Sequence, residues 1–257
     1  MGLAFLRQAL HPSAEGQAQD NVAIKAVFFD LYNTLARFDP PREEQQVRAC
    51  RDLGLALRPE FLPRAYHQAD DFMARENACS PISTRSEEDR RRFFTDYEGI
   101  ILRGCGLAVS DDLAYQVFAR VRQNPTRLAL FDDALPTLSA LKRRGFVLGL
   151  LSNIHRDLKR ITDDLGLASY LDFALSSQEA GAEKPYPPLF LAALARAGVK
   201  PQEALHVGDQ YRNDVVGARG VGIQPLLLDR YGLEAEADCP CIRSLADIEK
   251  YLDKSTN

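Results

Sequence analysis

Residues 23–35 read AIKAVFFDLYNTL, and this stretch decides the fold. Apart from Lys25, residues 23–29 are small, β-branched or aromatic, and the run ends at Asp30. A near-continuous apolar run of this length is typical of a strand that is buried on both faces of a parallel sheet. The carboxyl ends of such strands are where ligands bind in open α/β sheets. We therefore expect a buried strand that delivers Asp30 to a site.

Further apolar runs of the same kind follow, with helical patterns between them. Strands are expected at residues 146–151, 171–175, 204–207 and 225–228. Helices are expected at residues 134–144, 156–165, 188–197 and 213–219. This alternation predicts the α/β class, with a doubly wound, Rossmann-like parallel sheet.

One long segment, residues 40–127, breaks the alternation because it contains no convincing strand. Its charged segments carry apolar residues at helical spacing and predict four helices, at residues 42–53, 59–76, 86–102 and 111–123. We expect these helices to form a small bundle over the sheet. The predicted organisation is a flexible tail at 1–22, an α/β core formed by 23–38 and 128–257, and a helical cap at 39–127.

The composition narrows the class of protein. The chain has 257 residues, 46% of them hydrophobic and 26% charged, as in an ordinary globular protein of one or two domains. A net charge of -4 without a basic stripe disfavours a nucleic-acid partner. No apolar run approaches the ~20 residues that span a bilayer, so no membrane partner is expected. The five cysteines are scattered without a CxxC pair, which indicates reduced thiols and a cytoplasmic protein.

Reactive side chains follow four of the expected strands. The first strand ends at Asp30, the second at Ser152 and Asn153, and the fourth at Asp209, while the loop after the third carries Lys184. The carboxyl ends of parallel strands meet at one edge of the sheet, so these groups are expected to converge. The sequence thus predicts a site there for a small-molecule substrate.

Each group suits one chemical task, although each also has an ordinary structural use. The Asp30 carboxylate can form a covalent ester as a nucleophile, with Thr34 hydrogen-bonded to it, or it can simply form an Asx turn. Ser152 and Asn153 can donate to an anionic oxygen or cap the next helix. Lys184 can neutralise the reacting groups as a point charge, although most loop lysines are only solvated.

The stretch HVGDQYRND, residues 206–214, is the most specific. Its glycine allows a sharp turn after the strand, and Asp209 and Asp214 present hard oxygen ligands. Mg²⁺ typically takes one or two carboxylates together with waters and phosphate oxygens. A helix that opens with acidic residues would explain Asp214 but not the whole pattern.

The order of these motifs resembles that of the haloacid dehalogenase superfamily and spans residues 24–228. A strand is followed by DxxxT, a second strand by SN, a loop carries KP, and a later strand is followed by GDxxxND. The inserted helices resemble the cap of the subfamily with dehalogenases and phosphoglycolate-type phosphatases. The resemblance implies a hydrolase with Asp30 as nucleophile, Thr34 and Ser152 as phosphate-handling hydroxyls, and Lys184 as the lysine of the third motif. The implied Mg²⁺ ligands are Asp30, the main-chain carbonyl of Tyr32, Asp209 and Asp214, with Asp209 favoured over Asp214 for direct binding.

One position departs from the family pattern of phosphatases. Those enzymes carry a second aspartate two residues after the nucleophile as general acid and base, and this chain has Tyr32 there. A positioned acid or base contributes about 10²- to 10⁴-fold in rate. We therefore expect slow hydrolysis of ordinary alkyl phosphates.

Three functions follow from this departure. The motif-four acids favour a Mg²⁺-dependent phosphatase of a small phosphorylated metabolite. The Asp-Leu-Tyr sequence of residues 30–32 resembles that of metal-independent 2-haloacid dehalogenases. Those enzymes, however, carry Ser-Asn where this chain has Gly208 and Asp209, and a tyrosine at the position of Phe190. Their cap arginine has only Arg37 and Arg42 as candidates here. The third possibility is a weakly catalytic binding or regulatory protein.

Several further residues are assigned to structure. His155 is expected to be exposed in the first turn of a helix, and His206 to be a core histidine with satisfied hydrogen bonds. Tyr66, His67 and Phe72 fall at helical spacing and are expected to pack within the cap.

Overall fold

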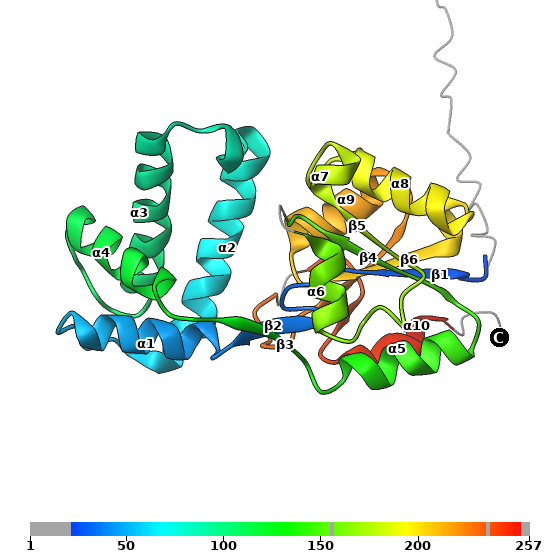
Figure 1. Ribbon diagram of the computed structural model, residues 1–257, viewed down its shortest axis with the longest axis horizontal. Coiled ribbons are helices and arrows are strands. Elements are labelled where there is room, and N and C mark those ends of the chain that lie inside the picture. The colour runs from blue at the N-terminus through cyan, green and yellow to red at the C-terminus, as the bar shows by residue number, and fades with distance from the viewer. Residues whose placement is uncertain (1–21, 155–156, 235–236, 253–257) are drawn as a thin grey trace, which may run out of the picture.

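A parallel sheet of six strands forms the centre of the computed structural model, which describes residues 22–154, 157–234 and 237–252 (Figure 1). The predicted tail, apart from Val22, and His155 lie outside these ranges. The strand order is β5-β4-β1-β6-β7-β8, so the strand before Asp30 lies inside the sheet. The strands are β1 (Ala26–Phe29), β4 (Val147–Ser152), β5 (Phe173–Ser176), β6 (Ala204–Gly208), β7 (Gln224–Leu228) and β8 (Cys241–Ile242).

Burial on both faces explains the apolar run of β1. Val27 and Phe29 belong to the apolar cluster on one face of the sheet, and Ala26 and Phe28 belong to the cluster on the other. Successive side chains of a strand point to opposite faces, so every residue of β1 has to be apolar. All four side chains are fully buried, which confirms the predicted buried strand.

Helices cover both faces of the sheet, as the α/β prediction requires (Figure 1). One face is covered by α5 (Ala134–Arg143), α6 (Leu158–Asp164), η5 (Leu245–Ile248) and α10 (Glu249–Leu252). The other is covered by α8 (Pro187–Ala197) and α9 (Gly217–Gly220). A short helix, α7 (Ser177–Ala180), follows β5, and a single 3₁₀ turn, η3 (Pro201–Glu203), precedes β6. The doubly wound fold is therefore confirmed.

The structure corrects the sequence prediction at several points. The helix expected at 213–219 is a π-helical segment, η4 (Tyr211–Val216), that continues into α9. The two-residue strand β8 was not expected. A two-stranded antiparallel sheet, β2 (Ala36–Asp39) and β3 (Arg127–Leu130), was also missed. Its strands have only four residues each and lie far apart in sequence, so no local hairpin pattern marks them.

The four helices expected between residues 42 and 123 are all present, and β2 and β3 lead into and out of them (Figure 1). Two apolar clusters pack them together. Ser86 and Ser110 accept hydrogen bonds from the first turns of α3 and α4, as N-caps do. The elements are α1 (Arg42–Asp52), η1 (Pro59–Phe61), α2 (Leu62–Cys79), η2 (Ile82–Thr84), α3 (Glu87–Gly104) and α4 (Asp111–Arg122). The predicted domain boundaries remain a prediction.

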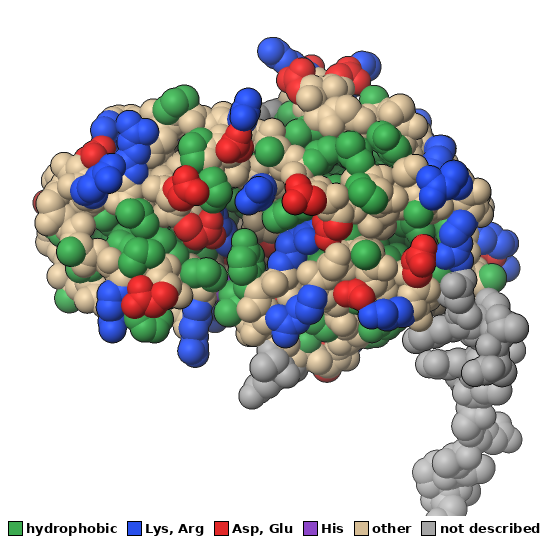
Figure 2. Space-filling model, turned by 90° about the horizontal axis from the view of Figure 1, so that it is seen from below, with side chains coloured by type: hydrophobic (Ala, Val, Ile, Leu, Met, Phe, Trp, Pro, Cys, Tyr) green, Lys and Arg blue, Asp and Glu red, His purple; other side chains and the backbone are tan. Residues whose placement is uncertain are grey.

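Three bulk properties accompany this fold. The helices within the described ranges include none that is long and apolar enough to cross a membrane. All five cysteines are free thiols. On the face drawn in Figure 2, acidic and basic side chains are interspersed and form no broad basic patch.

A buried glutamate lies inside the group formed by α1, α2 and α3. Glu98 is 2% exposed, and its carboxyl oxygen accepts a hydrogen bond from Gln46, which in turn accepts one of 2.9 Å from the Tyr66 hydroxyl. Burial raises the pKa of Glu98 to about 7, although the Gln46 hydrogen bond lowers it. The folded protein therefore holds this proton more tightly than the unfolded chain, in which a glutamate has its ordinary pKa of 4.5.

Glu98 should make the protein less stable as the pH rises. The loss begins near the unfolded pKa and is complete above the folded pKa, because the ionised carboxylate is desolvated. Glu98→Gln should therefore match wild type near pH 4.5 and gain about 3 kcal/mol of unfolding free energy above pH 7. Urea unfolding at both pH values measures this. Glu88→Gln, an exposed position on the same helix, is the control and should change stability by less than about 0.5 kcal/mol. An equal effect of Glu98→Gln at both pH values would contradict the burial argument.

Candidate active site

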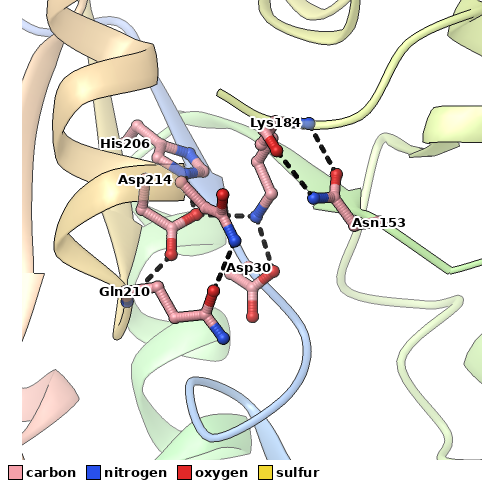
Figure 3. A network of polar contacts seen from close by, with 7 residues as sticks. Asp30, Asn153, Lys184, His206, Gln210 and Asp214 are labelled. Atoms are coloured by element: carbon pink, nitrogen blue, oxygen red, sulfur yellow. Dashed lines mark hydrogen bonds and ion pairs between the residues drawn. The ribbon is translucent and has the colours of Figure 1, made fainter. Parts of the chain in front are cut away.

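A buried lysine joins the side chains that the strand ends deliver (Figure 3). Lys184 Nζ lies 2.6 Å from Asp30 Oδ1 and 2.6 Å from Asp214 Oδ1. The side chain of Lys184 is only 2% exposed, so both ion pairs are withdrawn from water. Burial alone would lower the pKa of Lys184, but Asp214 and Asp30 outweigh it and raise that pKa. The lysine therefore stays charged, and it connects the first and fourth motifs.

Asp214 is fully engaged by protein groups. Its Oδ1 accepts from Lys184 and from His206 Nε2 at 2.9 Å, and its Oδ2 accepts from the backbone N–H of Gln210 at 3.0 Å. Burial would raise the pKa of Asp214, but Lys184 and His206 hold it well below the usual range. A side chain at Gly208 would place its Cβ 2.2 Å from Asp214 Cγ, so glycine is required there. Asp214 therefore holds Lys184 in place, and its role as a metal ligand remains a prediction.

His206 is more than the satisfied core histidine expected from the sequence. It is 1% exposed, and burial lowers its pKa despite Asp214. A neutral ring beside a carboxylate carries its hydrogen on Nε2, which then donates to Asp214. Nδ1 has no hydrogen-bond partner among the described residues. The prediction was correct for the burial of His206 and incomplete for its hydrogen bonds.

Asn153 holds the backbone of the lysine loop (Figure 3). Its Oδ1 accepts from Lys184 N at 2.7 Å, and its Nδ2 donates to Lys184 O at 2.9 Å. Ser152, which precedes it, is buried at the end of β4 beside Ser176 of β5. The structure thus places the Asn153 amide on the lysine loop, a contact that the sequence analysis did not anticipate.

The hydrogen bond expected between Thr34 and Asp30 is absent. Thr34 is fully buried, and its Oγ1 has no partner within the part of the chain that the structure describes. The Asp30 carboxylate instead accepts from Lys184 and from the backbone N–H of Leu31. That part of the prediction was wrong, because these two donors orient the Asp30 carboxylate without the hydroxyl. An unpaired buried hydroxyl remains beside the site as a donor for a ligand oxygen.

Asp30 and Asp209 form an electrostatically unfavourable pair. Burial raises the pKa of Asp30 to about 6 against the opposing effect of Lys184. Burial, together with Asp30 and Asp214, raises the pKa of Asp209 well above its usual range. A cation shared by Asp30 and Asp209 would relieve this repulsion, and two carboxylates are the protein ligands that Mg²⁺ commonly takes. Within the described ranges no cluster of three or more His, Cys, Asp or Glu side chains could hold a metal, so the donor set fits Mg²⁺ only with additional ligands.

Tyr32 occupies the position where the family's phosphatases carry their acid and base. Its ring lies 4.7 Å from the ring of Phe38, and burial raises its pKa despite the nearby Arg42. A tyrosine with a raised pKa stays protonated at neutral pH. It is a poor proton acceptor for a hydrolytic water.

A cavity of about 70 Å³ lies between α2 and the loops after β6 and β7. Asp209 and Asn33 line it from the sheet side, and Arg42, His67 and Asp70 line it from the helices. Asn33 has a left-handed backbone, with φ of 58°, and its side chain hydrogen-bonds Asp209. The sequence analysis missed Asn33, although asparagine is among the residues most enriched in this conformation after glycine.

The helices contribute charged groups that are already paired. Arg42 Nη1 donates to Asp70 at 2.6 Å, and the guanidinium lies 4.2 Å from the centre of the Tyr66 ring. His67 lies 3.3 Å from Glu234, so it faces the cavity and the packing role expected for it was wrong. Phe72 stacks on Phe93 inside the helical group, as expected.

The end of α2 also contacts the lysine loop. The Asn77 side chain donates to the Glu183 carboxylate, and the Tyr186 hydroxyl donates to the carbonyl of Ala78. Glu183 and Tyr186 lie within two residues of Lys184. The helical group is therefore bound to the same loop that supplies the buried lysine.

Comparison with known proteins identifies relatives of this chain. A family described as haloacid dehalogenase-like hydrolase matches residues 24–222. Haloacid dehalogenase-like hydrolase domain-containing protein 3 of Homo sapiens is 31% identical over 211 residues, 80% of this chain and 82% of that protein. Glyceraldehyde 3-phosphate phosphatase of Methanopyrus kandleri is 30% identical over 215 residues, 80% and 84% of the two chains. The crystal structure of a 2-haloacid dehalogenase from Pseudomonas syringae is 30% identical with a TM-score of 0.52, covering 89% of this chain and 98% of that one.

Replacing the buried Lys184 should lower the free energy of unfolding. Lys184→Met would leave Asp30 and Asp214 buried without their countercharge, and loss of one partner of a buried pair costs about 3–5 kcal/mol. Urea unfolding at neutral pH measures this. Lys142→Met removes the half-exposed pair with Asp172 and should cost less than about 1 kcal/mol. Similar losses in the two variants would show that Lys184 does not neutralise the buried acids.

Proposed function

This chain belongs to the haloacid dehalogenase-like hydrolases, and we propose that it is a Mg²⁺-dependent phosphatase of a small phosphorylated metabolite. The observation that carries the proposal is the buried Lys184 between Asp30 and Asp214, with Asp209 beside them. A named phosphatase among the relatives supports the same chemistry. The proposed compartment is the cytoplasm.

Asp30 is the proposed nucleophile. An oxygen of its carboxylate attacks the phosphorus of the substrate, the bond from phosphorus to the ester oxygen breaks, and the alcohol leaves with its electron pair and takes up a proton. Water then attacks the phosphorus of the aspartyl phosphate, loses a proton, and releases inorganic phosphate and the free carboxylate. Splitting the hydrolysis in this way replaces one difficult step with two easier ones.

Other residues of the chain hold the reacting groups. Lys184 orients Asp30 through the 2.6 Å contact and offsets negative charge at the phosphoryl group. Thr34 Oγ1 and Ser152 supply hydroxyl donors at the ends of β1 and β4. Asp30, Asp209 and the main-chain carbonyl of Tyr32 are the groups that would hold Mg²⁺, which neutralises phosphoryl oxygens when bound.

The helices α1–α4 are the proposed cap, with residues 39–127 as its span. Helix α2 lines the small cavity and contacts the lysine loop. A cap that excludes water from a site strengthens the electrostatic interactions within it. The size of the cavity favours a small substrate.

A 2-haloacid dehalogenase is the second candidate, and Tyr32 is the observation that favours it. Halide leaves as an anion and needs no proton, so the missing acid would not matter. Two features oppose it. Gly208 and Asp209 stand where those enzymes carry Ser-Asn, and Arg42, the cap arginine candidate at the cavity, is already paired with Asp70. The other candidate, Arg37, is exposed. A weakly catalytic binding or regulatory protein is the third candidate.

The metal requirement tests the proposal. Wild-type protein should hydrolyse 4-nitrophenyl phosphate only with added Mg²⁺, and Asp30→Asn or Asp209→Asn should lower the rate by at least about 10³-fold, because the nucleophile or the cation site is lost. Steady-state rates with Mg²⁺ and with EDTA measure this. Asp163→Asn, an exposed aspartate on α6, is the matched control and should keep wild-type activity. Turnover of 2-chloropropionate in EDTA would replace the proposal with dehalogenation, and turnover of neither substrate would replace it with a binding role.

Tyr32, at the position of the general acid and base in the family's phosphatases, gives a separate prediction. Tyr32→Asp should raise kcat/KM by up to ~10²-fold on alkyl phosphates, whose poor leaving groups need a proton. The gain should be smaller on 4-nitrophenyl phosphate, whose leaving group departs as an anion. The ratio of variant to wild-type kcat/KM across leaving groups of rising pKa measures this. A flat ratio in a folded variant would mean that Tyr32 does not stand at an acid and base position.

A further inference from the structure

A fifth strand end reaches the site, through a residue that the motifs do not include. Arg230 follows β7, and its guanidinium contacts the loop that follows Asp30. Its Nη2 donates to the carbonyl of Thr34 at 2.9 Å, and its Nε donates to the carbonyl of Asn33 at 3.3 Å. The side chain is 14% exposed, so water competes little for these two carbonyls.

Arg230 is itself held in place. Its Nη1 and Nη2 donate to the two oxygens of Asp133, each at 2.9 Å, in a bidentate pair. Its guanidinium lies 3.9 Å from the centre of the Phe131 ring. Asp133 also accepts from Ser244 Oγ at 2.8 Å and from Leu245 N at 3.0 Å. A planar guanidinium fixed on both sides is a rigid support.

The turn that Arg230 contacts needs such a support. Asn33 is the only non-glycine residue with positive φ in the described ranges, and this conformation costs about 1–3 kcal/mol outside glycine. The same residue connects two parts of the site, because its carbonyl faces Arg230 and its side chain hydrogen-bonds Asp209. Tyr32, whose carbonyl is a proposed metal ligand, immediately precedes it.

We propose that Arg230 is a positioning residue that holds the Asn33–Thr34 turn, and through it sets Tyr32 and Asp209 relative to Asp30. The catalytic part of this inference rests on the proposed function. Arg230 lines the cavity, so direct binding of a substrate anion is the competing role. Its four hydrogen bonds to Asn33, Thr34 and Asp133 leave little capacity for such a ligand, which favours positioning.

Two substitutions separate the roles. Arg230→Lys keeps the charge but loses the planar fork, and Arg230→Met loses both. If Arg230 positions the turn, both variants should lower kcat on 4-nitrophenyl phosphate by about 10- to 100-fold and change KM less than about twofold. Arg243→Met is the matched control, because Arg243 is 62% exposed and lies 3.9 Å from Asp229 beside the same loop. It should leave kcat unchanged.

Hydrogen exchange gives a second measurement that needs no activity. The N–H groups of Asn33, Leu35 and Ala36 bond within the turn, to Ala36 O at 2.7 Å and to Leu31 O at 2.9 Å and 2.8 Å. In both variants these amides should exchange at least about tenfold faster, while the amides of β6 keep their wild-type rates.

The outcomes are distinct. Wild-type exchange of these amides in the variants would overturn the inference, and so would a raised KM with unchanged kcat, which indicates substrate binding. A general rise in exchange throughout the sheet would also overturn it in favour of a purely structural role. If the wild-type protein hydrolyses no phosphate ester, the proposed function fails and the exchange measurement alone decides for or against Arg230.

Discussion

The buried charge of Lys184 is the interaction on which the rest of the site depends. An ammonium group and two carboxylates are removed from water here, and each would be costly to bury alone. Their mutual contacts of 2.6 Å, with His206 and the Gln210 N–H on Asp214, offset that cost. This set can form only if three separate loops arrive at one point. The electrostatic requirement therefore constrains the fold as much as the chemistry.

The parallel sheet meets this requirement through the order of its strands. β1 lies between β4 and β6, so the ends of these three strands carry Asp30, Asn153 and Asp209 to one edge. Glycine at position 208 makes room for the Asp214 carboxylate, which reaches back from η4. The loop after β5 is then fixed by two hydrogen bonds to Asn153. Backbone geometry thus decides where the candidate catalytic groups lie, and side-chain rotamers adjust them only locally.

The helices α1–α4 contact this arrangement through α2. Contacts from α2 reach the loop after β7 through His67 and the lysine loop through Asn77. The charges that α1 and α2 present to the cavity are largely paired, as Arg42 with Asp70 shows. Under the proposed function, a substrate in this cavity would therefore contact oriented dipoles and paired charges, and no single unpaired charge would dominate the electrostatic field there. This agrees with recognition by shape and hydrogen bonding for the part of the substrate remote from the reacting bond.

The sequence by itself determined the α/β class, the buried strand before Asp30, the helical insertion and most of the groups that meet at the strand ends. These follow from local periodicity and from the rule that parallel strands end together. It did not determine which acid holds the lysine, that Thr34 makes no hydrogen bond to Asp30, or that β2 pairs with β3. Arg230 and Asp133 were also missed, because a bidentate pair between residues so far apart in the chain leaves no local pattern. Only the tertiary structure decides such contacts, since hydrogen-bond partners of buried polar groups are chosen by the space that packing leaves them.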